Sequence, residues 1–138
     1  MSETSPIMQR FYKEIFEGGN LALIDELVAD DFVDHEEPLP GQPPGKEGVA
    51  FFVKALRAAF PDIKTKLEPP ALIDGNLEAV YVVCTGTHQG DFAGIPATGR
   101  SIEFGGIDII RFEDGKAAEH WGVTDTLKLM QQLGAVPE

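Results

Sequence analysis

Apolar residues recur every three or four positions from the start of the chain to Pro61, a spacing that is typical of amphipathic helices. A first helix is expected to begin at Pro6 and to end at Gly18, and a second, short one covers residues 20–28. A loop rich in proline, glycine and glutamate follows at residues 34–45. A third helix then ends at Pro61, because the residue before a proline avoids helical backbone angles. The pattern therefore predicts three helices in this part of the chain.

Beyond Pro61 the apolar period falls to two, which is the period of a β-strand. Asp114-Gly115 separates the last two expected strands and is a strong hairpin signal. The expected strands cover residues 63–67, 79–87, 102–112 and 116–122, and residues 89–100 form a loop. A final helix should follow, capped by Thr124. Its inward-facing residues are expected to be Leu127, Met130 and Leu133.

The order of these elements, with helices first and strands later, favours an α+β fold over repeated βαβ units. Gly86, Gly105 and Gly106 lie inside the expected strands, where glycine often marks a bulge or a tight bend. We therefore predict one domain over residues 1–138, in which N-terminal helices pack on a strongly curved antiparallel sheet and enclose a cavity.

Composition limits the partners, the location and the metal sites that we expect for this protein. The net charge of −12 argues against nucleic acid or an anionic membrane as a partner, because phosphate groups require a basic surface. No apolar run approaches the roughly 20 residues of a membrane helix, and no secretory signal is visible, so we expect a cytoplasmic protein. Cys84 is the only cysteine and is expected to be a buried, inert thiol. The three histidines lack the spacing of a zinc site, so no metal is expected.

Several stretches of the chain, in order over residues 5–134, resemble one known group of proteins. They are DDFVDHEEP, AFPDIK, CTGTHQGDFAGIPATGRSIEF, GIDIIRFEDGKAAEHWGVTD and QQLG. On these motifs the chain resembles the SnoaL-like polyketide cyclases and related ester cyclases of the NTF2-like superfamily. The resemblance implies a cone-shaped α+β barrel, a pocket for a small apolar molecule, and a homodimer paired through the exposed face of the sheet. The candidate residues for that face are Tyr81, Val83, Ile107 and Ile109.

The resemblance also implies a chemistry. These cyclases close a ring in an aromatic polyketide methyl ester by an aldol reaction, without metal or cofactor, when an acidic residue removes a proton next to a carbonyl group. The position of the family's acid/base aspartate is Gly122 in this chain, and the position of its pocket histidine is Asp108. The two positions should be neighbours across the Asp114-Gly115 hairpin. Either a swapped acid–base arrangement or a loss of the cyclase chemistry is open at this point.

Three residues are the candidates for catalysis. Strand alternation places Asp108 on an otherwise apolar face, where desolvation would raise the pKa of its carboxyl group and suit it to general acid–base catalysis. His120 could orient Asp108 or relay its proton, and His88 could help to stabilise an oxyanion. The structural alternatives are an aspartate bonded to a buried group, a lone structural histidine, and a histidine bonded to the loop that follows it.

Four further residues are the candidates for substrate binding. Asp34 and His35 match positions that face the cavity mouth in the resembled cyclases, although a surface pair in the loop is the alternative. Trp121 alternates away from His120, so it would reach a pocket only if a bulge turned it inward; otherwise it packs in the core or at an interface. Asp125 could face the pocket or could simply stabilise the N-terminus of the last helix.

Three functions are compatible with these residues. The first is a cofactor-free cyclase or isomerase that acts on a small apolar carbonyl compound. The second is a non-catalytic binding or dimerisation module, and Gly122 is its main support. The third is water addition of the epoxide-hydrolase type, which needs an arginine beside two aspartates. Alternation disfavours the third, because it places Arg111 on the opposite face from Asp108, toward Glu103 or Glu119.

Overall fold

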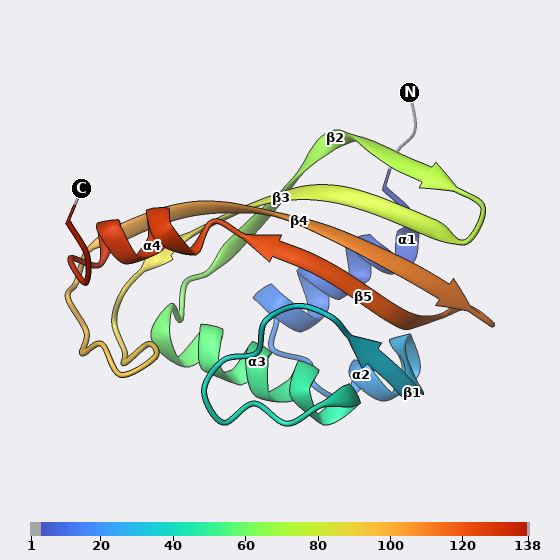
Figure 1. The fold of residues 1–138 in the computed structure, drawn as a ribbon, viewed down its shortest axis with the longest axis horizontal. Helices are drawn as coiled ribbons and strands as arrows, with labels where there is room; N and C mark the ends of the chain where they lie inside the picture. Colours follow the sequence, from blue (N-terminus) through green and yellow to red (C-terminus); the bar gives the residue numbers. More distant parts are fainter. Residues whose placement is uncertain (1–3, 138) are drawn as a thin grey trace.

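Three short helical segments precede the sheet in the computed structural model (Figure 1). The structure describes residues 4–137, so the ends of the predicted domain 1–138 lie outside the described residues. They are α1 (Pro6–Arg10), the π-helical η1 (Phe11–Glu17) and α2 (Leu23–Leu27). The predicted helix start is confirmed: the Ser5 side chain accepts a hydrogen bond from the backbone N–H of Met8, and a proline takes the first helical position.

A five-stranded sheet follows, in the spatial order β1-β5-β4-β3-β2. Its strands are β1 (Val28–Asp34), β2 (Lys64–Asp74), β3 (Leu77–Thr87), β4 (Ser101–Glu113) and β5 (Lys116–Thr124). All neighbours pair antiparallel except β1, which lies parallel to β5. The predicted hairpin joins β4 to β5, and both of its turn residues adopt a positive φ, 52° at Asp114 and 77° at Gly115.

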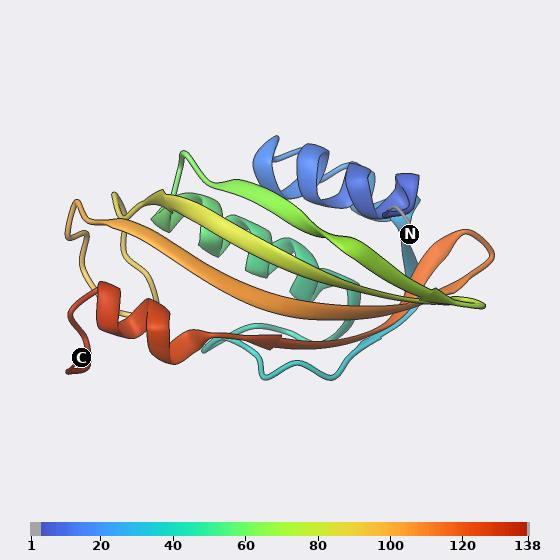
Figure 2. The same cartoon turned by 90° about the horizontal axis from the view of Figure 1, so that it is seen from above.

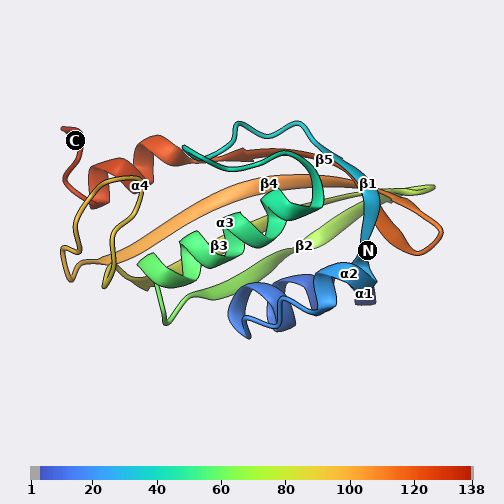
Figure 3. The ribbon, with the colours of Figure 1, turned by 90° about the horizontal axis from the view of Figure 1, so that it is seen from below.

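The sheet curves along its strands, and helices cover one of its faces (Figure 2). Helix α3 (Gly45–Ala59) lies over the sheet and runs roughly along its strands, with the N-terminal helices beside it (Figure 3). It contacts β1 and η1, and its residue Val53 is fully buried. This is the cone-like α+β arrangement that the sequence predicted, because the apolar side of each helix and the inner face of the sheet share one core.

Strand β1 is absent from the sequence prediction, which extended the second helix to Val28. The helix ends at Leu27 instead, and Val28 adopts extended backbone angles (φ −119°, ψ 132°) and pairs with Ala117 of β5. The physical reason for the error is the burial of β1. It buries only Val28 and Phe32, which are four residues apart, so the alternation that identifies a strand is missing.

Strand β2 is longer than predicted. The predicted strand stopped before Pro69-Pro70, whereas β2 continues through them to Asp74. Proline is tolerated there because β2 is an edge strand, and because its register with β3 shifts between Glu68 and Leu72.

The last helix, α4 (Thr126–Gln132), begins one residue later than expected. Its N-cap is Asp125 rather than Thr124. Leu127, which was expected in the core, is 63% exposed. The buried residues of this segment are Leu129 and Leu133.

The face of the sheet opposite the helices carries exposed apolar side chains. Tyr81 and Ile107 lie opposite each other in register and are 47% and 49% exposed. Ile109 and Val123 extend this apolar face, and Val83 is half-buried on it. The four residues predicted for a subunit interface therefore share one surface. In the part of the chain that the structure describes, no helix has the length and apolar character needed to cross a membrane.

Candidate active site

A cavity lies between the helices and the inner face of the sheet, and most of its lining is apolar. The space in it that is open to water-sized molecules is about 110 Å³. Its apolar lining includes Met8, Phe11, Phe16, Leu27, Phe32, Phe52, Leu56, Val82, Phe104 and Ile110. Among the ionisable residues that also line it, five lie close together, and we call them the acid–histidine cluster. They are Tyr12, Asp34, Glu36, Asp108 and His120.

Asp108 points into the cavity from the middle of β4. It pairs with Val80 of β3 and with Gly122 of β5. The neighbours of Asp108 on the same face, Phe104 and Ile110, are both buried, so the alternation inferred from the sequence is correct here. A carboxylate on this apolar face must be compensated by hydrogen bonds or by opposite charge.

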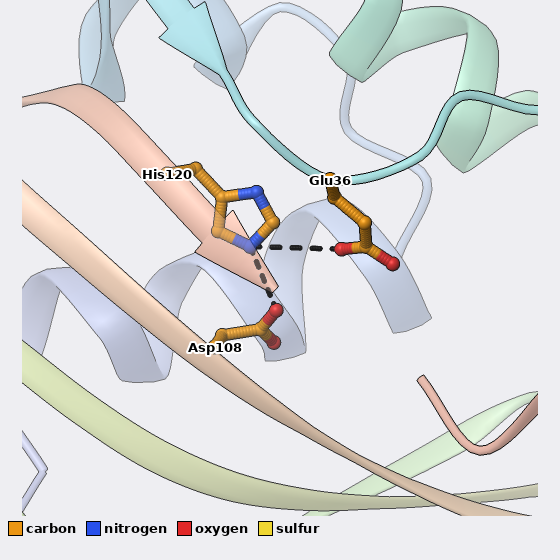
Figure 4. A group of neighbouring side chains, drawn as sticks. All are labelled: Glu36, Asp108 and His120. Carbon is orange, nitrogen blue, oxygen red and sulfur yellow. Dashed lines mark hydrogen bonds and ion pairs between the residues drawn. The ribbon is translucent and has the colours of Figure 1, made fainter. Parts of the chain in front are cut away.

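His120 supplies that compensation from β5. Its Nε2 lies 2.8 Å from Asp108 Oδ1, and its Nδ1 lies 2.8 Å from Asp34 Oδ1, at the end of β1 (Figure 4 shows the contact with Asp108). Burial alone would lower the pKa of His120. The hydrogen bonds to Asp108 and Asp34 outweigh burial and raise this pKa from 6.5 to about 10. At neutral pH the ring is therefore an imidazolium that donates a proton to a carboxylate on each side.

Asp34 and Tyr12 complete the surroundings of this ion pair. Burial acts to raise the pKa of Asp34, but the hydrogen bond from His120 prevails and the pKa is lowered. Tyr12, which is almost fully buried in η1, donates its hydroxyl proton to Asp108 Oδ2. Burial and the charge of Asp108 raise the pKa of Tyr12 well above its usual value, so the phenol stays protonated. Both oxygens of Asp108 thus accept a hydrogen bond.

Glu36 faces the same ring nitrogen of His120 as Asp108 does (Figure 4), whereas Asp34 contacts the other ring nitrogen. Its Oε1 is 3.8 Å from His120 Nε2, and its Oε2 accepts a hydrogen bond of 3.0 Å from the Thr124 hydroxyl. Burial first, and then the negative charge of Asp108, raise the pKa of Glu36. The sequence interpretation treated Glu36 as part of a surface loop, because a run of acidic residues gives no sign of which of them turns inward.

The sequence interpretation also missed Tyr12, which it treated only as part of an apolar helix face. Tyr12 and Asp108 are 96 residues apart in the chain, and no local pattern connects them. The one signal for Glu36 was its position in the DDFVDHEEP motif.

The structure does not bring His88 to the acid–histidine cluster. Its side chain is fully buried on the inner side, as alternation suggested, but it comes eight residues after Val80, the partner of Asp108. Eight residues of extended strand span about 25 Å. His88 Nδ1 lies 2.9 Å from Thr98 Oγ1, in the loop that follows, and its ring packs against Phe60. This geometry matches the structural alternative given for His88.

Three of the four residues predicted to bind substrate also lie outside the described cavity lining; only Asp34 is part of it. The His35 side chain is 42% exposed and forms an ion pair with Glu119 at 2.6 Å. Its ring stacks on the ring of Trp121. Trp121 therefore faces away from the cavity, as strict alternation along the strand requires. Asp125 is exposed and accepts a hydrogen bond from the backbone N–H of Lys128, so it caps α4.

Arg111 lies on the outer face, as predicted. It forms ion pairs with Glu113 and Glu119, both at 3.0 Å. The arginine that water addition of the epoxide-hydrolase type would require is therefore absent from the described lining of the cavity.

A metal ion is the remaining alternative for the cluster. Glu36, Asp108 and His120 each present one ligand atom, and these atoms lie within 4.8 Å of one another. A metal would need an unprotonated His120 Nε2. That nitrogen is held as a donor to Asp108, and the pKa of the ring is raised to about 10. The donor set therefore favours a proton over a metal ion at this position.

The chain is similar to several known bacterial proteins. The family described as SnoaL-like polyketide cyclase matches residues 6–133. The chain is 30% identical over 128 residues to aklanonic acid methyl ester cyclase DauD of Streptomyces sp. (strain C5). This alignment covers 88% of this chain and 78% of that protein. It is also 28% identical over 120 residues to nogalonic acid methyl ester cyclase of Streptomyces nogalater, and this alignment covers 86% of this chain and 89% of that protein. The solved structure of TsrD from Streptomyces laurentii matches with a TM-score of 0.84 and 27% identity, and covers 97% of this chain and 100% of that one.

Proposed function

The chain belongs to the SnoaL-like polyketide cyclase family, and we propose that it is an enzyme that closes or isomerises a ring in an apolar carbonyl compound by acid–base chemistry, without a cofactor. One observation carries the proposal. A carboxylate, Asp108, is held by an imidazolium, His120, on the wall of a mostly apolar cavity. Paired ionisable groups in a desolvated cavity are what proton transfer from carbon requires.

Asp108 is the proposed proton acceptor. It would take a proton from the carbon next to a substrate carbonyl group, and the negative charge would move from Asp108 to the enolate oxygen. The His120 cation lies beside Asp108, and it would stabilise the charge after the transfer if the enolate oxygen also lies next to the ring. Tyr12 and Asp34 would act as positioning residues, because they hold Asp108 and His120 by hydrogen bonds.

The substrate class comes from the relatives. Two of them are named for the methyl esters of aromatic polyketide acids, nogalonic and aklanonic acid. The aromatic lining by Phe11, Phe16, Phe52 and Phe104 supports a planar, apolar substrate. We propose a compound with an enolisable carbonyl group of this kind.

The experiment compares the parent protein with Asp108→Asn and with Asp125→Asn, which changes an exposed cap of α4. Ring closure of the two methyl esters is followed by absorbance, and ligand binding is measured separately by calorimetry. We expect Asp108→Asn to lower kcat/KM by about 10²- to 10⁴-fold while binding persists, and Asp125→Asn to retain activity. Equal turnover by the parent and Asp108→Asn would refute the assignment.

Binding without catalysis is the second candidate function. Its support is that both nitrogens of His120 and both oxygens of Asp108 already have partners within the protein. Such a closed network can serve specificity alone. Tight binding of the esters by a parent protein that never converts them would favour this candidate.

Two further properties are proposed. The exposed apolar face around Tyr81 and Ile107 supports a homodimer that buries this face. A cytoplasmic location stays a prediction from the sequence.

A further inference from the structure

Gly122 leaves open a space that the acid–histidine cluster uses. A Cβ atom at this position would lie 2.3 Å from Glu36 Oε1 and 2.7 Å from His120 Cε1, and both distances are too short for any real side chain. Gly122 is not among the residues with a positive φ, so its backbone does not require glycine. What the position provides is the absence of a side chain, and the carboxyl group of Glu36 fills the space.

Glu36 is held in this space from one side only. Thr124, which follows Gly122 by two residues on the same strand, donates its hydroxyl proton to Oε2. Oε1, the oxygen nearer His120, accepts no hydrogen bond from the residues that the structure describes. Glu36 therefore presents one free carboxyl oxygen beside the cavity.

This arrangement differs from that of Asp108. Asp108 accepts hydrogen bonds at both oxygens, one from the His120 cation and one from Tyr12. Glu36 faces the carboxylates of Asp108 and Asp34, the His120 cation and, more distantly, the Tyr12 phenol. Burial and the charge of Asp108 raise its pKa, which favours the protonated form. Two carboxyl groups with opposed environments suit the two halves of an acid–base reaction.

We propose that Glu36 is the general acid of this site, placed by the space above Gly122, and that it gives its proton to the substrate oxygen that becomes negatively charged. The inference rests on the proposed function, in which Asp108 takes the proton from carbon. In an aldol closure, the new carbon–carbon bond forms as the electrons of the second carbonyl move onto its oxygen, and that oxygen receives the Glu36 proton.

The site can then return to its starting state without another reactant. After the reaction Asp108 carries a proton and Glu36 has lost one. His120 Nε2 lies 2.8 Å from Asp108 Oδ1 and 3.8 Å from Glu36 Oε1. A small shift of the Glu36 side chain toward the ring would bring it within hydrogen-bond reach, and His120 would then pass its proton to Glu36 and take the one on Asp108. The proton count of the cycle is balanced.

The first test compares Glu36→Gln with Glu47→Gln, an exposed glutamate of α3 outside the cavity. An acid must be protonated, so parent kcat should fall as pH rises through the pKa of Glu36. We expect Glu36→Gln to lower kcat by about 10²-fold or more and to remove this alkaline decline, with KM little changed. Glu47→Gln should match the parent. If Glu36→Gln keeps the parent kcat and pH profile while Asp108→Asn is inactive, this inference fails and the proposed function stands.

The second test moves the carboxyl group. Gly122→Ala should displace Glu36 toward solvent, and a carboxyl ¹³C NMR titration should then show the pKa of Glu36 falling toward its ordinary value. Glu36→Ala should be inactive, and adding Gly122→Asp to it should restore part of kcat by supplying a carboxyl group to the same space. An unchanged Glu36 titration in folded Gly122→Ala, or no restoration in a folded double variant, would overturn the role of this space. A parent protein that converts no enolisable ester would instead refute the proposed function.

Discussion

Replacing His120 by glutamine should change how the stability of this protein depends on pH. Folding raises the pKa of His120 from 6.5 to about 10, so the folded protein binds one more proton than the unfolded chain between these values. The stability due to this proton is complete below pH 6.5 and is lost as pH rises toward 10. The free energy of unfolding of the parent should therefore fall across this range.

The size of the effect follows from the same shift. Because proton binding is linked to folding, one such group lowers the free energy of unfolding by about 2 kcal/mol as pH rises from 6.5 to about 8.5. Two other buried acids in this region ionise above this interval: burial raises the pKa of the Cys84 thiol to about 12 and the pKa of Tyr12 well above its usual value. Within the interval, His120 is thus the main source of the slope that distinguishes parent from variant.

Urea unfolding followed by far-ultraviolet circular dichroism, at several pH values in this interval, measures the slope. His120→Gln should remove about 2 kcal/mol of the parent's pH dependence. His35→Gln is the matched control, because His35 is also paired with a carboxylate but is 42% exposed. If His120→Gln does not fold, Asp34→Asn should lower the pKa of His120 and give an intermediate slope. Identical slopes in the parent and a folded His120→Gln would refute the imidazolium.

Two further predictions concern the assembly and the metal-free chemistry. Ile107→Lys places a charge on the exposed apolar face, so it should convert a dimeric parent to a monomer, as measured by light scattering. The control Leu127→Lys, on α4, should leave the dimer intact. A parent protein that is itself a monomer would contradict the proposed dimer. Dialysis against EDTA should leave kcat unchanged, because His120 Nε2 carries a proton; a loss of activity that Zn²⁺ or Mg²⁺ restores would show that the cluster binds a metal.

The sequence predicted the parts of this fold that have a regular pattern. Alternation placed Asp108 on the inner face and Arg111 on the outer one, and both placements are correct. The prediction missed β1, because this strand has no alternation of buried and exposed residues. It also misplaced His88, because alternation shows which face of the sheet a residue lies on but not how far along the strand it is from the site. His88 shares the inner face with Asp108 but lies far along the sheet from it.

The acid–histidine cluster itself was only half predictable. Asp108, His120 and Asp34 stood out as charged residues at recognised positions. Tyr12 and Glu36 did not, because a tyrosine on an apolar helix and a glutamate in an acidic loop are common in any small domain. Their roles depend on contacts between segments far apart in the sequence, and no local signal records such contacts.

The parallel pairing of β1 with β5 has a consequence for how the protein folds. The hydrogen bonds that build the cluster join residues separated by 86 positions (Asp34 and His120), 88 positions (Glu36 and Thr124) and 96 positions (Tyr12 and Asp108). Closing such long loops is slow, and it cannot begin until β5 has left the ribosome. The pairings of β2 with β3 and of β3 with β4 can form earlier, because they join neighbouring segments and do not need β5. The cluster is therefore expected to be among the last parts of the fold to form, and the site would stay incomplete until β5 has been synthesised.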